Sequence, residues 1–168
     1  SNMINEYGLK SGSKVLQIGC DKGFLLHDFL LQDIEIEIAG LEVSDYAIEQ
    51  SLEPTRPYIQ KGSFTRFPFE DKTFDLVICV GPVYSLILGD AIKCLKEIER
   101  VKSGASFISL ASYESEEDFW LFRDWTVLGS TMLKEDEWKE VLQHAGYTGD
   151  YKFNSAKSLN LIREKTVK

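Results

Sequence analysis

The stretch VLQIGCDKGFLL, from Val15 to Leu26, decides the fold. The run VLQI leads into a turn with two glycines, and dense apolar residues follow that turn. This order predicts a buried strand, a tight turn and the first turns of a helix, with which many α/β proteins build a nucleotide pocket. A dinucleotide loop carries three glycines as GxGxxG, whereas this loop has Asp21 and Phe24 at the second and third of those places. The stretch therefore predicts a ligand-binding turn that is poorly suited to a pyrophosphate.

The composition favours a single soluble domain over residues 1–168. Of these residues 43% are hydrophobic, enough for an ordinary core. The 27 acidic and 19 basic residues give a net charge of −8, so we expect no nucleic-acid partner. No apolar run approaches the roughly 18 residues that span a bilayer, so we expect no membrane partner. The three cysteines have no CxxC or Cys/His spacing, which predicts no metal site and favours a reducing cytoplasm. Ser1 and Asn2 before Met3 look like the remnant of a cleaved tag.

Strands and helices alternate along most of the chain. The expected strands are 14–18, 34–42, 58–61, 74–80 and 106–112, and the expected helices between them are 23–31, 44–51 and 91–101. Ser103 and Gly104 are expected to end the last of these helices. After a late helix that ends at Gly146, the extended segments 147–153 and 158–163 predict an antiparallel hairpin at the sheet edge. The pattern predicts an α/β fold with a doubly wound, mostly parallel sheet of about seven strands.

The segment 113–133 has two interpretations. Phe119, Phe122 and Trp125 share one face of a helix, which predicts an amphipathic helix packed on the core. Trp120 lies off that face and charged residues adjoin it, so the alternative is a lid that covers a substrate. The sequence leaves both interpretations open.

Two features predict an adenosine-containing cofactor. The Gly19–Gly23 loop lets a ligand approach bare backbone, at the carboxyl end of a strand where open parallel sheets bind ligands. Glu42 ends the next strand, about 20 residues further on, where an acid accepts hydrogen bonds from ribose hydroxyls. An acidic loop suits a cofactor with a cationic sulfonium and an amino group better than it suits NAD or FAD.

Five segments resemble the class I S-adenosylmethionine-dependent methyltransferases. VLQIGCDKG at 15–23 is similar to the first motif of that family, IAGLEVSDYAIEQS at 38–51 to its second-strand motif, and FPFEDKTFDLVICV at 67–80 to the motif entering its fourth strand. EIERVKSGASFISL at 97–110 resembles the helix into the fifth strand, and LKEDEWKEVLQHAGY at 133–147 resembles the late helix. The resemblance implies a Rossmann-like methyltransferase fold, S-adenosylmethionine as cofactor and S-adenosylhomocysteine as product.

The same resemblance implies which residues surround the cofactor. The methionine part would be surrounded by Gln17, Gly19, Cys20, Asp21 and Gly23, and the ribose would be bound by Glu42. The adenine would be surrounded by Val43, Gly62, Ser63 and Phe64. Beneath the cofactor would lie Cys79 and Val80. Three of these residues depart from the family pattern, because Gln17 replaces an acid, Asp21 a glycine and Ser63 an aspartate. Asp21 either holds the ammonium group of the cofactor or crowds its methionine tail, and the sequence leaves this open.

The chemistry implied by the resemblance is in-line methyl transfer to a small-molecule acceptor. The leaving group is good, so the protein has mainly to align the reactants and exclude water. Tyr84, just after the fourth strand, is the candidate for acceptor contact or proton handling, and its alternative is a tyrosine that only packs. VGPVY at 80–84 lacks the Asn-Pro-Pro-Tyr type of motif, which argues against nucleic acid as acceptor. The rival functions are a non-catalytic cofactor-binding or partner protein with a degenerate fold, and an NAD-dependent oxidoreductase; the acceptor and the oligomeric state are not predicted.

Overall fold

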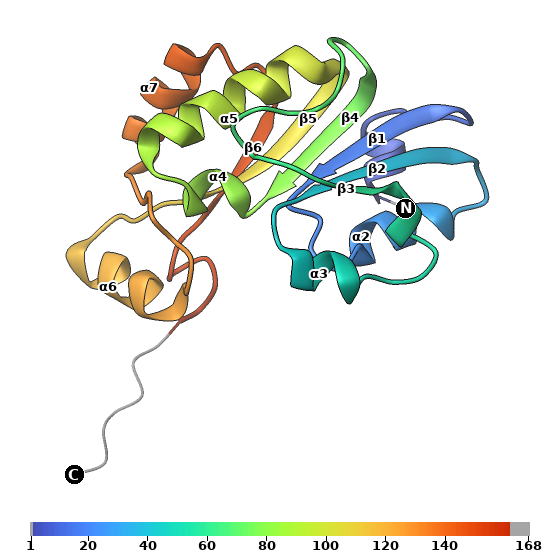
Figure 1. Ribbon diagram of the computed structural model, residues 1–168. Coiled ribbons are helices and arrows are strands. Elements are labelled where there is room, and N and C mark those ends of the chain that lie inside the picture. Colours follow the sequence, from blue (N-terminus) through green and yellow to red (C-terminus); the bar gives the residue numbers. More distant parts are fainter. Residues whose placement is uncertain (1, 162–168) are drawn as a thin grey trace.

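Six parallel strands form one sheet in the computed structural model, which describes residues 2–161 (Figure 1). The strands are β1 Ser13–Ile18, β2 Ile36–Glu42, β3 Ile59–Lys61, β4 Phe74–Val80, β5 Lys102–Ala111 and β6 Asp150–Asn154. Their order across the sheet is β3-β2-β1-β4-β5-β6, and every neighbouring pair is parallel. The doubly wound parallel architecture is therefore confirmed, with six strands in the described part against the approximate seven expected.

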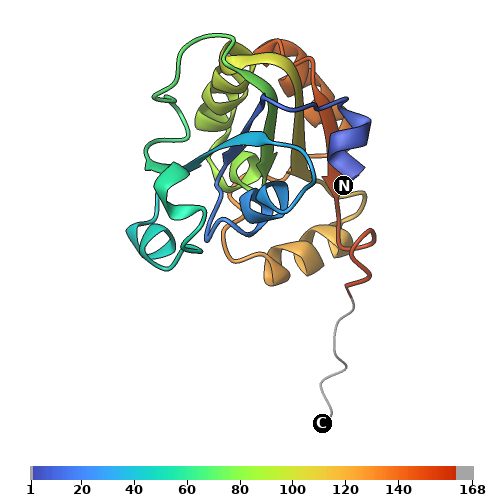
Figure 2. The ribbon, with the colours of Figure 1, turned by 90° about the vertical axis from the view of Figure 1, so that its right-hand side faces the viewer.

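Helices cover both faces of this sheet. They are α1 Asn2–Glu6, α2 Phe24–Leu30, α3 Asp45–Glu49, α4 Pro82–Ser85, α5 Leu88–Val101, α6 Glu116–Trp125 and α7 Glu135–Ala145, with a 3-10 turn at Arg56–Tyr58. Side chains of α5 and α7 fill the core on one face of the sheet, and side chains of α2 fill the core on the other. Figures 1 and 2 show α6 apart from both layers, below the carboxyl ends of the strands.

The central strand β4 has the bounds that its sequence predicts. Its residues Leu76 to Cys79 are fully buried. A strand with helices on both faces needs apolar side chains at successive positions, and the run LVIC supplies them. Asp75 is the charged exception, and its carboxylate accepts a hydrogen bond of 2.8 Å from the backbone N–H of Lys14 on β1.

The prediction for Ser103 and Gly104 was wrong. Helix α5 ends at Val101 and β5 begins at once, so both residues lie inside the strand. The pairing of β5 with β4 is irregular there, and a Cβ on Gly104 would overlap the backbone carbonyl of Asp75. Gly104 therefore serves a close approach of two strands rather than the end of a helix.

The prediction of an antiparallel hairpin at the sheet edge was also wrong for the described residues. Gly146 ends α7 with φ +71°, and the chain returns so that β6 runs parallel to β5. Tyr147 fixes this return, because its hydroxyl donates to the carbonyl of Asp150 (2.9 Å) and accepts from Ser106 (3.1 Å). Residues 156–160 form a turn instead of a strand, and the end of the expected segment 158–163 lies outside the described residues.

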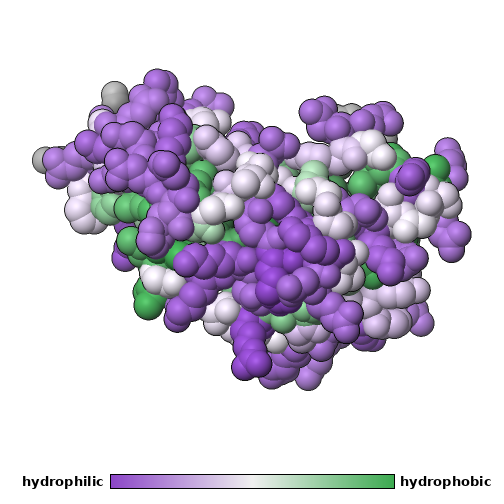
Figure 3. Space-filling model, turned by 90° about the horizontal axis from the view of Figure 1, so that it is seen from above, coloured by the Kyte–Doolittle hydropathy of each residue, from purple (hydrophilic) through white to green (hydrophobic). Residues whose placement is uncertain are grey.

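The surface seen from above is mostly hydrophilic, with apolar residues in small separate groups (Figure 3). Within residues 2–161, no helix combines the length and the apolar character that crossing a bilayer requires.

Candidate functional site

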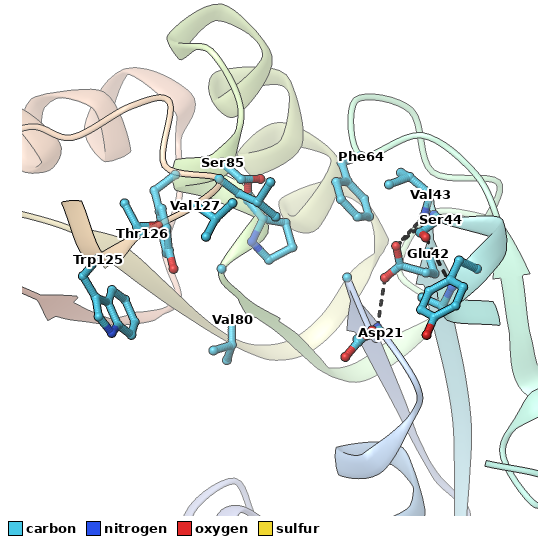
Figure 4. A pocket seen from close by; sticks show the side chains of 17 residues that line it. Asp21, Glu42, Val43, Ser44, Phe64, Val80, Ser85, Trp125, Thr126 and Val127 are labelled. Carbon is cyan, nitrogen blue, oxygen red and sulfur yellow. Dashed lines mark hydrogen bonds between the residues drawn. The ribbon is translucent and has the colours of Figure 1, made fainter. Parts of the chain in front are cut away.

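A cavity of about 600 Å³ opens at the carboxyl ends of β1, β2 and β4 (Figure 4). It lies where the strand order reverses between β1 and β4, which is where open α/β sheets bind ligands. Its volume falls within the roughly 300–1,000 Å³ of small-molecule pockets. Asp21, Glu42 and Ser44 line one end of it, and Trp125, Thr126 and Val127 line the other.

Glu42 is the hydrogen-bonding centre of the acidic end. Its carboxylate accepts the backbone N–H groups of Asp21 (2.9 Å), Val43 (2.8 Å) and Ser44 (3.0 Å), and the residue is 6% exposed. A carboxylate offers about four acceptor sites, so about one is left for a ligand hydroxyl. These bonds tie the loop after β1 to the end of β2.

The glycines of that loop are required by backbone geometry and by packing. Gly19 has φ +66°, and a Cβ there would overlap the ring of Pro82. Gly23 has φ +78°, and a Cβ there would overlap the hydroxyl of Thr55. Asp21 between them has φ +47°, a conformation that aspartate adopts more readily than most residues. The loop therefore holds a shape that exposes backbone at the base of the cavity.

Gln17 on β1 is 8% exposed, and its Oε1 has no hydrogen-bond partner among the described residues. An unpaired buried polar group of this kind costs about 1–3 kcal/mol. Gln17 comes two residues before Gly19, and it lies outside the lining of the cavity.

The buried cysteines are packing residues rather than nucleophiles. Burial, with the nearby Glu42 carboxylate, raises the pKa of Cys20 to about 12. Burial also raises the pKa of Cys79, whose thiol lies beside that of Cys94. Cys20 is 2% exposed and Cys79 is fully buried, and both side chains lie in the core outside the cavity lining.

We expect Cys20 to resist alkylation in the folded protein. A pKa near 12 in place of 9.0 lowers the thiolate fraction about 1,000-fold at pH 8, and burial restricts access further. Treatment with iodoacetamide followed by mass spectrometry should show labelling at least about 100-fold slower than in urea-unfolded protein. Labelling of Cys20 at the unfolded rate would contradict this assignment.

Tyr84 and residues 125–128 form the other side of the cavity. The Tyr84 ring packs edge-on against Phe122, with ring centroids 6.3 Å apart, and burial raises the pKa of its hydroxyl above 10.0. Its backbone carbonyl accepts the N–H groups of Ser130 (3.0 Å) and Thr131 (2.9 Å). The segment after α6 is therefore fastened beside the cavity by α4.

Residues 9–160 match the model of a family described as a methyltransferase domain. The chain belongs to the class I S-adenosylmethionine-dependent methyltransferases. The order of the strands, the glycine loop and the acid that ends β2 agree with this membership.

The chain matches part of the length of its curated relatives. It is 29% identical over 102 residues to sterol 24-C-methyltransferase of Schizosaccharomyces pombe, which is 53% of this chain and 26% of that protein. It is 32% identical over 110 residues to cycloartenol-C-24-methyltransferase 1 of Oryza sativa, 61% of this chain and 31% of that protein. It is 25% identical over 118 residues to the uncharacterized methyltransferase YdaC of Bacillus subtilis, 67% of this chain and 64% of that protein. The chain thus spans between about a quarter and just under two thirds of the length of these relatives.

Solved structures agree on the fold. The YcgJ protein of Bacillus subtilis gives a TM-score of 0.70 at 20% identity, over 86% of this chain and 65% of that chain. A SAM dependent methyltransferase from Aquifex aeolicus gives a TM-score of 0.62 at 20% identity, over 86% of this chain and 77% of that chain. At such identities the likeness shows a shared methyltransferase fold.

The structure brings about half of the expected site residues to the cavity. Those that line it are Gly19, Asp21, Glu42, Val43, Phe64, Val80 and Tyr84. Those outside its lining are Gln17, Cys20, Gly23, Gly62, Ser63 and Cys79. Ser63 turns its hydroxyl to its own loop, where it pairs with the Thr65 hydroxyl (2.9 Å) and accepts the Thr65 N–H (3.2 Å).

Several lining residues were not singled out from the sequence. They are Ser44, Tyr46, Ala47, Ser85 and residues 126–128. The family resemblance implies that residues 81–84 face the acceptor, and Gly81 and Pro82 line the cavity. For Val127 and Leu128 the signal in the sequence is weak, because two apolar residues after a helix are as typical of a core segment.

Proposed function

We propose that this chain binds S-adenosylmethionine between the Gly19–Gly23 loop and Glu42, and transfers a methyl group to a small-molecule acceptor. The observation that carries the proposal is the buried carboxylate of Glu42, bonded to the loop backbone at one end of the cavity. Bound S-adenosylmethionine supplies a methyl carbon activated by its sulfonium charge. The similarity to sterol methyltransferases supports a small molecule as acceptor.

The residues at the acidic end fit this cofactor. Glu42 has about one free acceptor site for a ribose hydroxyl. Val43 and Phe64 offer apolar surface for adenine, and Asp21 offers a negative charge for a cationic group. Charge, apolar surface and the free acceptor site of Glu42 therefore suit a cationic nucleoside.

The residues on the other side have the properties needed to position an acceptor. Val80 and Pro82 form an apolar wall at the end of β4, and Trp125 faces the cavity from the end of α6. Such a wall excludes water and limits the orientations of the acceptor. The Tyr84 hydroxyl, like that of an ordinary tyrosine, is protonated at neutral pH, and burial raises its pKa further, so it serves as a hydrogen-bond donor rather than as a base.

Replacing Asp21 with asparagine should weaken S-adenosylmethionine binding more than S-adenosylhomocysteine binding. The two ligands differ by the sulfonium charge, and an exposed ionic interaction contributes about 0.2–1 kcal/mol. We therefore expect the affinity for S-adenosylmethionine to fall about two- to fivefold more than the affinity for S-adenosylhomocysteine at low salt, as measured by isothermal titration calorimetry. An equal loss of affinity for both ligands would place Asp21 beside the ammonium group, which both ligands carry, and a gain in affinity would mean that Asp21 crowds the cofactor tail.

Calorimetry with S-adenosylmethionine tests the proposal against its rivals. We expect saturable one-to-one binding and a higher melting temperature. Release of labelled methyl groups into organic-soluble products would then show transfer to a small molecule. Binding without transfer across a broad set of small molecules would favour the non-catalytic rival, and stabilisation by NADH alone would favour an oxidoreductase.

A further inference from the structure

We infer that the acceptor is an uncharged, predominantly apolar molecule that brings its own nucleophilic lone pair or electron-rich carbon, and that it binds beside residues 125–128. The inference rests on the proposed function, because it concerns the part of the cavity that the cofactor would leave open. Three observations carry it: the distribution of charge, the state of the polar groups and the exposed apolar edge.

Charge is confined to one end of the cavity. Asp21 and Glu42 are the charged residues of the lining, and neither lysine, arginine nor histidine occurs among the described residues that line it. Val80, Trp125 and Val127 gather at the opposite end (Figure 4). An anionic acceptor would lose hydration there without meeting a cationic side chain, and the two acids would repel it. A protonated amine would also lose hydration, and its nitrogen has no lone pair for the methyl group.

Most polar groups at the apolar end are already paired. The Ser85 hydroxyl donates to the Pro82 carbonyl (2.8 Å), and the Gly81 N–H donates to the Ser109 hydroxyl (3.1 Å). The hydroxyl of Tyr84 is a phenol, which is protonated at neutral pH, and burial raises its pKa further. No lining residue at this end is therefore suited to remove a proton from the acceptor before the reaction.

The absence of a base at this end sets the form of the reaction. An electron pair of the acceptor forms the new bond to the methyl carbon, and the electron pair of the broken C–S bond stays on sulfur to give S-adenosylhomocysteine. Any proton made acidic by the transfer leaves the product for water afterwards. A weakly basic neutral amine or an electron-rich carbon meets this requirement, whereas an unactivated alcohol does not.

An apolar edge borders this end of the cavity. Val127 is 95% exposed, Leu128 73% and Trp125 53%. Thr126 between them is fixed by a 2.8 Å hydrogen bond from its N–H to the Phe122 carbonyl, so the edge stands at a defined position. Single exposed apolar residues are common, but neighbouring ones beside a cavity indicate an apolar binding partner. An apolar acceptor would cover them.

Three naphthalene probes of one shape test the preference. The wild-type chain is first saturated with S-adenosylhomocysteine, and then 2-naphthalenemethanol, 2-naphthoate and 2-naphthylmethylammonium are titrated at pH 7.5 by calorimetry. We expect the neutral alcohol to bind at least about tenfold tighter than either ion, since a buried charge without a partner is costly. An ion that binds as tightly as the alcohol, or the failure of all three to bind, would overturn the inference.

A matched pair of substitutions places the probe. Leu128→Lys adds a cation to the apolar edge, and should weaken alcohol binding while it strengthens naphthoate binding by about threefold or more. Leu31→Lys makes the same change at a residue that is 67% exposed and outside the cavity lining, and should change neither. Equal effects of the two substitutions would overturn the inference. Failure of S-adenosylhomocysteine to bind would contradict the proposed function. If S-adenosylhomocysteine binds but the chain prefers an ionic probe to the alcohol, only the inference about the acceptor is overturned.

Discussion

Replacing Glu42 with alanine is expected to weaken S-adenosylhomocysteine binding at least 100-fold. The substitution removes the acceptor of three backbone N–H groups and, in our proposal, of one ribose hydroxyl. Hydrogen bonds to a charged group contribute about 1.5–3 kcal/mol each, and 100-fold corresponds to about 2.7 kcal/mol. Isothermal titration calorimetry measures the affinity, and thermal melting should show a lower midpoint because the loop after β1 loses its attachment to β2.

Asp45→Ala is the control for this substitution. Asp45 is an acid three residues further on, with a side chain 68% exposed and an ion pair to Lys61, so it tests the loss of a nearby charge alone. We expect the affinity of the Asp45→Ala variant for S-adenosylhomocysteine to stay within about threefold of wild type, because a surface ion pair contributes little free energy. An affinity of the Glu42 variant within that same range would contradict the role given to Glu42.

Replacing Gly19 with alanine is expected to destabilise the protein by about 3 kcal/mol and to abolish cofactor binding. The residue has φ +66°, where a side chain costs about 1–2 kcal/mol. The new Cβ would also overlap the ring of Pro82, and overpacking of this kind costs about 1–3 kcal/mol more. Urea unfolding measures the loss of stability, and calorimetry with S-adenosylhomocysteine measures the loss of binding.

Gly8→Ala separates the two causes. Gly8 has φ +59°, but an added Cβ would meet no atom within 4 Å. It should therefore show the backbone cost alone, about 1–2 kcal/mol, with cofactor affinity unchanged. Equal losses of stability in the two variants would mean that overlap with Pro82 adds nothing to the loss of stability in the Gly19 variant.

The elements that the sequence predicts best are those whose local pattern and tertiary environment agree. The run FDLVICV specifies a doubly covered strand, and β4 occupies those residues. Glu42 ends β2 as the alternation of that strand predicts, and Ser44 caps α3 through a bond from the Ala47 N–H. Each of these depends on neighbours within a few residues.

The errors concern features decided by distant residues. Ser103 and Gly104 have the composition of a helix end, but the approach of Asp75 on β4 makes them part of β5. The direction of β6 is set by packing of α7 and by the buried contact of Tyr147 with Ser106. Short-range patterns contain neither piece of information.

The site shows the same division. Asp21 and Glu42 were found because a motif and a strand end mark them. In one of the two interpretations of segment 113–133, Trp125 shares the packed face of the helix with Phe122; Phe122 is fully buried, whereas Trp125 is 53% exposed at the cavity. The helix ends at Trp125, so the helical periodicity that placed this residue on the core no longer determines its surroundings.

The most direct test of the account is a crystal structure of the chain grown with millimolar S-adenosylhomocysteine. We predict density for the ligand between the backbone of Gly19 and the carboxylate of Glu42, with a ribose hydroxyl bonded to Glu42. Ligand density at another place, or a cavity that contains only solvent at saturating ligand, would contradict the account.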